Sequence, residues 1–169
     1  STLIGAIIPG LDYIYTKGVV HGNLKPNNIF LSAQNQPLLT DFGLALGKGE
    51  AATPYTSPEQ VQGAVVDRRT DVYALGALLY TLLAGQAPTP GTAAGIRSIR
   101  PDVPQTVEQV IGKAMAQNPD QRYQSPGEFH VALINALKPA PAPIEQQPTA
   151  PPPQPQAPAK KGTNWTSII

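Results

Sequence analysis

The sequence predicts a mainly α-helical domain with a small β-hairpin and a disordered proline-rich tail. Two short strand-like runs, Ile29–Leu31 and Pro37–Thr40, flank a turn of Ala, Gln and Asn, which is the pattern of a hairpin. Residues 72–85 form a nearly continuous apolar run of the length of a buried helix, with further helical patterns on both sides. Between residues 139 and 158, nine of the chain's 20 prolines stand among Ala and Gln, a composition that cannot bury a core.

Composition places the chain among ordinary globular domains. Its 169 residues suggest one domain, and 41% apolar residues suffice for a hydrophobic core. The net charge is +1, so the chain lacks the basic character that favours nucleic-acid binding. Cysteine is absent, which excludes a disulfide framework and a cysteine-rich zinc site. The first residue is Ser rather than Met, which suggests that the sequence begins inside a larger protein.

The segment Leu3–Lys17 is expected to be the first helix. Its apolar residues follow a helical stripe of Leu3, Ile7, Leu11 and Ile14. Pro9 and Gly10 interrupt this stripe, and an interior proline costs about 3 kcal/mol in a helix. We therefore expect a kink here, or a helix that starts again with Pro9 in its first turn.

The most apolar run, Val72–Gly85, predicts the central core helix. A helix that is apolar all round is normally buried, and this run is too short to cross a bilayer. Asp71 stands at the expected N-cap. The leucines expected to fill the core are Leu75, Leu78, Leu79 and Leu82.

Two more helices are predicted near the end of the domain. A helix over Val107–Ala116 begins with Thr106 and Gln109 at the spacing of a capping box. A last helix begins after Ser125 as N-cap, with a proline in its first turn, and ends at Leu137. The side chains expected to point inward are Val110, Ile111, Met115, Phe129, Leu133 and Leu137.

The densest chemistry lies between Val20 and Gly43, in the sequence VHGNLKPNNIFLSAQNQPLLTDFG. The predicted hairpin brings the segment before its first strand beside the residue after its second strand. Lys25 and Asn28 on one side and Asp41 on the other should therefore meet at one point. An ammonium, an amide oxygen and a carboxylate at that point suit Mg2+ and the phosphates that it carries.

The same stretch resembles two motifs of the protein kinases, the catalytic loop HRDLKPxN and the metal-binding DFG. The matching residues are His21, Leu24, Lys25, Pro26 and Asn28 in the first motif, and Asp41, Phe42 and Gly43 in the second. This resemblance implies that Asn28 and Asp41 hold Mg2+ and that they bind ATP together with Lys25. It also implies structural roles for the flexible Gly43 and for His21, which would bond the backbone near Asp41.

Two residues depart from the catalytic-loop motif. Gly22 replaces the family's Arg, and Asn23 replaces the Asp that accepts the proton of the substrate hydroxyl. An amide has no useful basicity, and general-base assistance is worth about 10²- to 10⁴-fold in rate. Positioning and metal electrostatics carry much of phosphoryl transfer, so the catalytic positions Asn23 and Lys25 are consistent with either no transfer or slow transfer.

Three further residues would be structural by the same resemblance. The segment Leu44–Glu59 resembles the kinase activation segment and ends in SPE. Its Glu59 would pair with Arg122 of the later NPDQR run, and Asp71 would hold the catalytic loop through backbone amides. Because the segment is short and Gly22 has no side chain to bind a phosphate, we expect no control by loop phosphorylation.

The resemblance assigns residues 1–138 to the C-terminal lobe of a kinase. The Gly-rich loop, strand Lys and partnering Glu of the N-terminal lobe are not among these residues, so this chain alone should bind Mg2+ and ATP weakly or not at all. Residues 139–161 are expected to be a disordered linker. Residues 162–169 follow a basic pair and include a Trp, which suits the start of a transmembrane segment or a ragged end. The domain would then lie in the cytoplasm or on the cytoplasmic face of the membrane.

Three functions stay open from the sequence. The first is a pseudokinase of the bacterial Ser/Thr kinase type, which would signal by binding ATP, a partner kinase or another signalling protein. The second is a slow Ser/Thr kinase that transfers the γ-phosphate of ATP to protein hydroxyls. The third is a non-enzymatic interaction module with a proline-rich arm. No nucleic-acid partner is expected.

Overall fold

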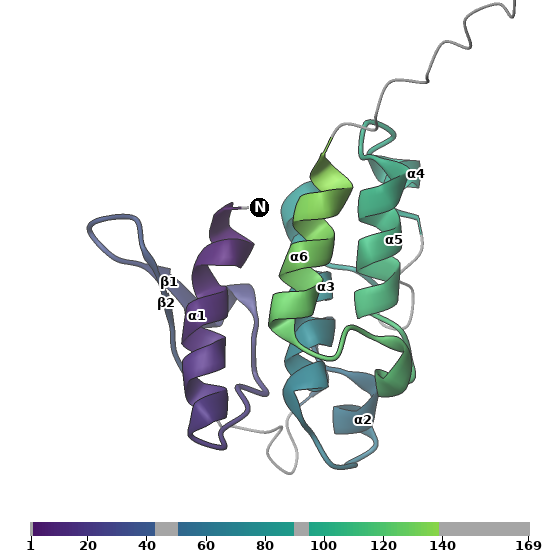
Figure 1. The fold of residues 1–169 in the computed structure, drawn as a ribbon. Coiled ribbons are helices and arrows are strands. Elements are labelled where there is room, and N and C mark those ends of the chain that lie inside the picture. The colour runs from purple at the N-terminus through teal and green to yellow at the C-terminus, as the bar shows by residue number, and fades with distance from the viewer. Residues whose placement is uncertain (1, 43–50, 90–94, 139–169) are drawn as a thin grey trace, which may run out of the picture. The chain divides into compact units, whose positions relative to one another are not determined.

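The computed structural model of the protein describes residues 2–42, 51–89 and 95–138. These residues are mostly helical and contain one small antiparallel sheet, so the predicted fold class is confirmed (Figure 1). The elements in chain order are α1 (Thr2–Thr16), η1 (Pro26–Asn28), β1 (Ile29–Leu31), β2 (Pro37–Leu39), α2 (Pro58–Val61), α3 (Arg68–Ala84), α4 (Ile96–Ile99), α5 (Gln105–Ala114), η2 (Pro119–Gln121) and α6 (Pro126–Leu137). Gly43, the predicted linker over 139–161 and the segment 162–169 lie outside the described residues.

Helix α3 is the centre of the domain. It packs against α5 and α6 and also contacts α1 and α4 (Figure 1). Every residue from Thr70 to Tyr80 is buried, as the apolar run predicts. The prediction that Leu82 fills the core is wrong, because its side chain is 51% exposed. The last turn of α3 extends past the buried stretch, so its residues are no longer covered on every side.

The start of α3 also differs from the prediction. The helix begins at Arg68, and its N-cap is Asp67, whose carboxylate accepts a 2.7 Å hydrogen bond from the Arg69 backbone N–H. Asp71 is therefore not the N-cap but a buried residue in the first turn. The apolar pattern could not show this turn, because Arg68, Arg69 and Thr70 are polar and helical at the same time.

Helix α1 continues through Pro9 without a break, so the predicted restart at this proline is wrong. Pro9 and Gly10 are exposed, while Ile7 and Ile8 before them and Leu11 after them are buried. The buried residues on both sides hold the two halves of the helix against the same core. This packing offsets the hydrogen bond that the proline cannot donate.

The two C-terminal helices confirm the predicted elements but only one of the predicted caps. Helix α6 starts at Ser125, whose hydroxyl accepts from the Glu128 backbone N–H at 3.1 Å. Helix α5 begins at Gln105 with Pro104 as its N-cap and has no side-chain cap, so Thr106 lies inside the first turn, where its hydroxyl donates to the Ala136 carbonyl at 2.8 Å. The inward residues are buried as predicted except Leu137, which is 47% exposed at the end of α6. None of the described helices is long and apolar enough to cross a membrane.

The hairpin forms where the sequence predicts it. Strands β1 and β2 pair antiparallel, with Ile29 opposite Leu39 and Leu31 opposite Pro37. Asn35 occupies the left-handed conformation in the connecting turn, with φ of 57°. The pairing extends by one backbone hydrogen bond beyond the strands, from the Thr40 N–H to the Asn28 carbonyl at 3.1 Å. This bond places the residue after Thr40 beside the end of η1.

Two glycines of α3 and α5 differ in how much space surrounds them. A Cβ atom on Gly76 of α3 would lie 2.8 Å from the Ala114 Cβ and 2.9 Å from the Met115 Cγ, whereas a Cβ on Gly112 of α5 would meet nothing within 4 Å. We expect Gly76→Ala to lower the free energy of unfolding, because overpacking costs about 1–3 kcal/mol and outweighs the helix propensity of Ala.

The matched substitution Gly112→Ala should instead raise the free energy of unfolding by up to about 1 kcal/mol, because only the helix-propensity gain applies. Chemical denaturation of both variants measures the two effects. Equal shifts of the same sign would contradict a close approach of α3 and α5 at Gly76.

Candidate functional site

The loop that joins α1 to η1 carries most of the predicted site residues. Gly18, with φ of 72°, ends the helical turn, and the Val19 N–H bonds the Ile14 carbonyl at 3.0 Å. His21 and Leu24 then point into the protein and are 0% and 1% exposed. Pro26 opens η1, where its lack of an N–H and its fixed φ are well tolerated. The loop is thus anchored by two buried side chains, with polar residues between and after them.

Asp71 of α3 fixes the backbone of this loop from inside the domain. Its Oδ2 accepts from the His21 N–H at 3.0 Å, and its Oδ1 accepts from the Gly22 N–H at 2.8 Å. The Tyr15 hydroxyl of α1 donates to Oδ2 at 2.8 Å. Burial raises the pKa of Asp71 above its ordinary value, although the hydrogen bonds from Gly22, Tyr15 and His21 act in the opposite direction. The carboxylate therefore joins the first helix, the loop and the central helix at one point.

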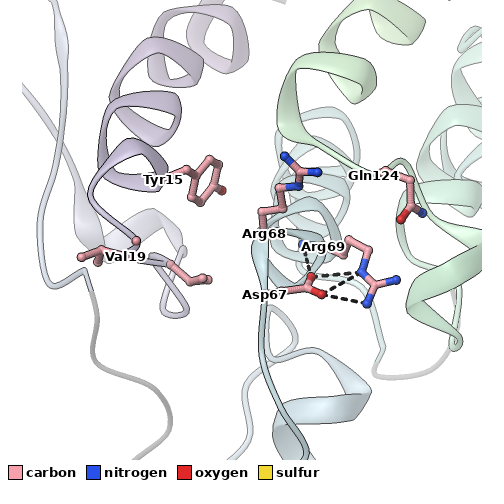
Figure 2. A pocket seen from close by; sticks show the side chains of 8 residues that line it. Tyr15, Val19, Asp67, Arg68, Arg69 and Gln124 are labelled. Carbon is pink, nitrogen blue, oxygen red and sulfur yellow. Dashed lines mark hydrogen bonds and ion pairs between the residues drawn. The ribbon is translucent and has the colours of Figure 1, made fainter.

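Tyr15 is a participant that the sequence reasoning missed. Burial, together with the charge of Asp71, raises the pKa of its hydroxyl, so the group remains a hydrogen-bond donor. Tyr15 also borders a cavity of about 410 Å³ between the end of α1 and the start of α3. Figure 2 shows Tyr15 facing Arg68 across this cavity, with the Asp67–Arg69 ion pair on the side of α3.

A backbone hydrogen bond between the two chain segments brings the predicted metal ligands close together. Asn28 ends η1 and is buried, and Asp41 follows Thr40, whose N–H bonds the Asn28 carbonyl. The Asn28 side-chain amide donates to the Asn23 carbonyl at 2.8 Å. This bond fixes the orientation of the amide, and within the described part of the chain its Oδ1 accepts no hydrogen bond. Asp41 is exposed and has a left-handed φ of 58°, and within the described residues its carboxylate accepts only a long 3.5 Å bond from the Thr40 hydroxyl.

Lys25 is the N-cap residue of η1 and is half-buried. The structure records no contact between its ammonium and Asn28 or Asp41. The backbones of the three residues therefore lie in one region, as predicted. The Lys25 ammonium forms no hydrogen bond or ion pair with either candidate ligand. In the described residues there is also no cluster of three or more His, Cys, Asp or Glu side chains that could hold a metal by itself.

His21 bonds a different partner from the one expected. Its Nδ1 accepts from the Asn23 N–H at 3.3 Å, rather than from the backbone near Asp41, and among the residues that the structure describes its buried Nε2 has no hydrogen-bond partner. Burial lowers the pKa of His21, so the ring is neutral and Nδ1 is free to accept. The ring meets Phe42 edge-on, with centroids 6.3 Å apart. The aromatic contact, rather than a hydrogen bond, links His21 to the segment that follows β2.

Asn23 is held by its backbone on both sides. Its N–H donates to the His21 ring and its carbonyl accepts from the Asn28 amide. Its side chain is half-buried, and in the described part of the protein it makes no hydrogen bond. The position expected for a catalytic base is therefore well defined in space but carries an amide instead of a carboxylate.

Glu59 and Arg122 form a buried ion pair. Two nitrogens of the Arg122 guanidinium each donate to one oxygen of Glu59 at 2.7 Å. The other N–H groups donate to the carbonyls of Arg69, Ala116 and Gln117, so all five guanidinium donors are used. Burial tends to raise the pKa of Glu59, but the bonds and charge of Arg122 and the Thr70 hydroxyl bring that pKa below its ordinary value. The carboxylate therefore stays ionised at neutral pH.

The hydroxyls before α2 are engaged in local turns. Thr56 accepts from the Thr53 N–H at 2.9 Å, and the two threonine hydroxyls lie 3.0 Å apart. Ser57 is buried as the N-cap of α2 in a capping box with Gln60. The first part of the predicted activation segment, residues 44–50, lies outside the described residues.

Comparison with known proteins gives one clear family. The model of the protein kinase domain matches residues 1–136. The chain belongs to the protein kinase family. The serine/threonine-protein kinase PknB of Mycolicibacterium smegmatis is 34% identical over 157 residues, which are 78% of this chain and 25% of the relative. The probable serine/threonine-protein kinase SCO3848 of Streptomyces coelicolor is 31% identical over 156 residues, 78% of this chain and 23% of that protein.

Solved kinase structures give the same result. The Mycobacterium tuberculosis PknI kinase domain aligns with a TM-score of 0.67 at 30% identity, over 80% of this chain and 54% of that chain. A double mutant of the same kinase domain aligns with a TM-score of 0.68 at 32% identity. The chain thus spans about a quarter of the length of the related bacterial kinases and about half of the solved kinase domains. We therefore refer to residues 20–28 as the catalytic loop, and to residues 41–59, which are the DFG motif together with the segment 44–59, as the activation segment.

The Glu59–Arg122 pair should be a main determinant of stability. Removing one partner of a buried ion pair leaves an uncompensated charge, so Arg122→Ala should lower the free energy of unfolding by about 3–5 kcal/mol. Arg122→Lys should also destabilise the protein, because an ammonium cannot donate five hydrogen bonds in a planar fork. Thermal and urea unfolding measure both effects.

Arg100→Ala is the matched control. Arg100 forms an ion pair with Asp102 at 2.7 Å, but both side chains are largely exposed. An exposed pair contributes little to stability, so this variant should unfold close to the wild-type midpoint. An Arg122→Ala protein that unfolds like Arg100→Ala would show that the buried pair does not stabilise the fold.

Gly22 should resist replacement by the arginine typical of the family. Its φ is 68°, a conformation that costs residues with a Cβ about 1–2 kcal/mol. We expect Gly22→Arg and Gly22→Ala to lower the free energy of unfolding by similar amounts, because the strain arises at the Cβ atom. Asn27→Arg, at an exposed position of the same loop, controls for the added charge. Unchanged midpoints for both Gly22 variants would show that the native loop does not require this conformation.

Proposed function

We propose that this kinase domain is a pseudokinase: it binds Mg2+ and ATP through the catalytic loop and the start of the activation segment, but lacks a catalytic base. It would signal by a change of conformation that is recognised by a partner kinase or another signalling protein. The observation that carries the proposal is Asn23, which occupies the base position in an otherwise complete loop scaffold. Its backbone is held at both ends by His21 and Asn28, so only the chemistry of its side chain departs from the family.

The residues present suit a magnesium–phosphate complex. Mg2+ prefers one or two protein oxygen ligands together with phosphate oxygens and water, rather than a cage of protein carboxylates. Asn28 offers an amide oxygen whose orientation is fixed by the bond to Asn23, and Asp41 offers an exposed carboxylate close by along the hairpin. The lack of a three-residue metal cluster in the described residues agrees with this mode of binding. When bound, Mg2+ would neutralise the phosphate charge that Asp41 alone would repel.

A slow Ser/Thr kinase is the second candidate, and the intact scaffold favours it. The Asp71 contacts and the Glu59–Arg122 pair hold the loop and the activation segment in place even though Asn23 is not a base. Positioning and electrostatics supply most of the catalysis of phosphoryl transfer. The two candidate functions therefore share the same ATP site. They differ only in whether the γ-phosphate is transferred to a protein hydroxyl at a measurable rate.

Nucleotide binding is tested by calorimetry on the full-length protein with ATP, in the presence and absence of Mg2+. We expect Mg2+-dependent binding that is lost in Asp41→Ala and in Asn28→Ala, because each removes a metal ligand. Asp12→Ala and Asn27→Ala remove an exposed carboxylate on α1 and an exposed amide next to Asn28, and both variants should bind like the wild type. Equal binding by all four variants, or no binding by the wild type, would refute the proposed site and favour a non-enzymatic interaction module.

Phosphate transfer separates the two kinase candidates. We expect the wild type to transfer no γ-phosphate to a generic Ser/Thr substrate above background, and Asn23→Asp to gain at least about 10²-fold, the usual contribution of a general base. Measurable transfer by the wild type with only a small gain in Asn23→Asp would identify a slow kinase instead. Nucleotide affinity should be similar in both proteins, because Asn23 is not a metal ligand.

A further inference from the structure

One contact in the structure joins helix α2, which begins at the end of the activation segment, directly to the catalytic loop. Gln60 of α2 directs its side-chain amide toward the loop, and its Nε2 donates to the Gly22 carbonyl at 2.6 Å. The two residues are 38 positions apart in the chain. Gln60 lies immediately after the Glu59 that pairs with Arg122, so the base of its side chain is tied to the domain by the buried ion pair.

The other end of the Gln60 amide is fixed as well. Its Oε1 accepts from the Ser57 backbone N–H at 3.0 Å and from the Ser57 hydroxyl at 3.1 Å. The amide therefore acts as a bridge: the oxygen faces the activation segment and the nitrogen faces the catalytic loop. These partners also settle which atom of the amide is the nitrogen, because only an N–H can donate to the Gly22 carbonyl.

The Gly22 residue is thereby held from both sides. Its N–H donates to Asp71 and its carbonyl accepts from Gln60. The peptide bond after Gly22 leads to the N–H of Asn23, and the Asn23 carbonyl in turn accepts from Asn28. A chain of hydrogen bonds thus runs from α2 through Gly22 and Asn23 to the predicted metal ligand Asn28.

We propose that Gln60 is a positioning residue that sets the orientation of the 22–23 peptide, and through it the Asn28 amide, by an uncharged link that requires no phosphorylation. The link uses the backbone carbonyl of residue 22, so it is made although Gly22 has no side chain. A neutral amide and a carbonyl form it in the unmodified protein. The role assigned to Asn28 rests on the proposed nucleotide site, whereas the link itself does not.

The substitution Gln60→Glu removes only the N–H donor of this side chain. The substituted side chain has nearly the same shape and can still accept from Ser57, but it cannot donate to the Gly22 carbonyl. Gln62→Ala is the control at the C-cap of the same short helix, because Gln62 is exposed and its side chain makes no hydrogen bond in the described structure. Gln60→Asn, which is one methylene shorter, should fail to span both partners.

The first measurement is amide hydrogen exchange by NMR on the full-length protein without nucleotide. We expect the His21, Gly22 and Asn23 amides to exchange about five- to tenfold faster in Gln60→Glu, the change expected from losing one hydrogen bond. The Phe129 and Leu133 amides of α6 should keep the wild-type rate, and Gln62→Ala should change none of them. Unchanged loop amides, or equal acceleration of the loop and α6, would overturn the proposal.

The second measurement is Mg2+-dependent ATP affinity of the same variants. A weaker affinity in Gln60→Glu with wild-type affinity in Gln62→Ala supports the link to Asn28. Equal affinity in both, despite faster loop exchange, overturns the claim that Gln60 positions Asn28. A wild type that binds no nucleotide refutes the proposed function, while the exchange data by themselves still decide whether Gln60 holds the loop.

Discussion

The buried carboxylate of Asp71 is the interaction on which the geometry of the catalytic loop depends. It sits in the first turn of the central helix, where the core fixes its position, and it accepts from Tyr15, His21 and Gly22. Burying this carboxylate without these donors would cost much free energy, so a conformation that breaks any of the three hydrogen bonds is disfavoured. The backbone of the polar loop is thus fixed in position by hydrogen bonds to the buried central helix.

A second buried charge plays the same role for the activation segment. Arg122 uses all of its N–H groups between Glu59 and three carbonyls, and the Tyr73 ring lies 5.1 Å from its guanidinium carbon. Glu59 is thereby fixed beside the start of α3, and Gln60 is carried with it to the catalytic loop. In the described residues, the structural contacts expected of Asp71, Glu59 and Arg122 are therefore present, while Gly22 and Asn23 are the two positions that depart from the catalytic-loop motif.

Local patterns predicted much of this arrangement, and the misses have physical causes. The hairpin and the Ser125 cap were predictable because neighbouring residues decide them. The start of α3 was not, because Arg68–Thr70 extend the helix with polar residues that the apolar pattern does not count. The predicted capping box at Thr106 is wrong because α5 already begins at Gln105, and the Thr106 hydroxyl bonds the Ala136 carbonyl of another helix. Leu82 and Leu137 fit the apolar stripe but lie in terminal helical turns where about half of each side chain remains exposed.

The sequence by itself determined the chemical groups of the site: an amide at the base position, the two candidate metal ligands, and the glycine that accepts a left-handed φ. It also determined that the ligands lie on either side of one hairpin. Only the tertiary structure decided what holds them. The sequence gives no signal for Tyr15, and its Ser57–Gln60 capping-box spacing does not show that Gln60 also bonds the Gly22 carbonyl. His21 bonds Asn23 rather than the backbone near Asp41. Such partners are far apart in the chain and meet through the packing of α1, α2 and α3, which no local pattern encodes.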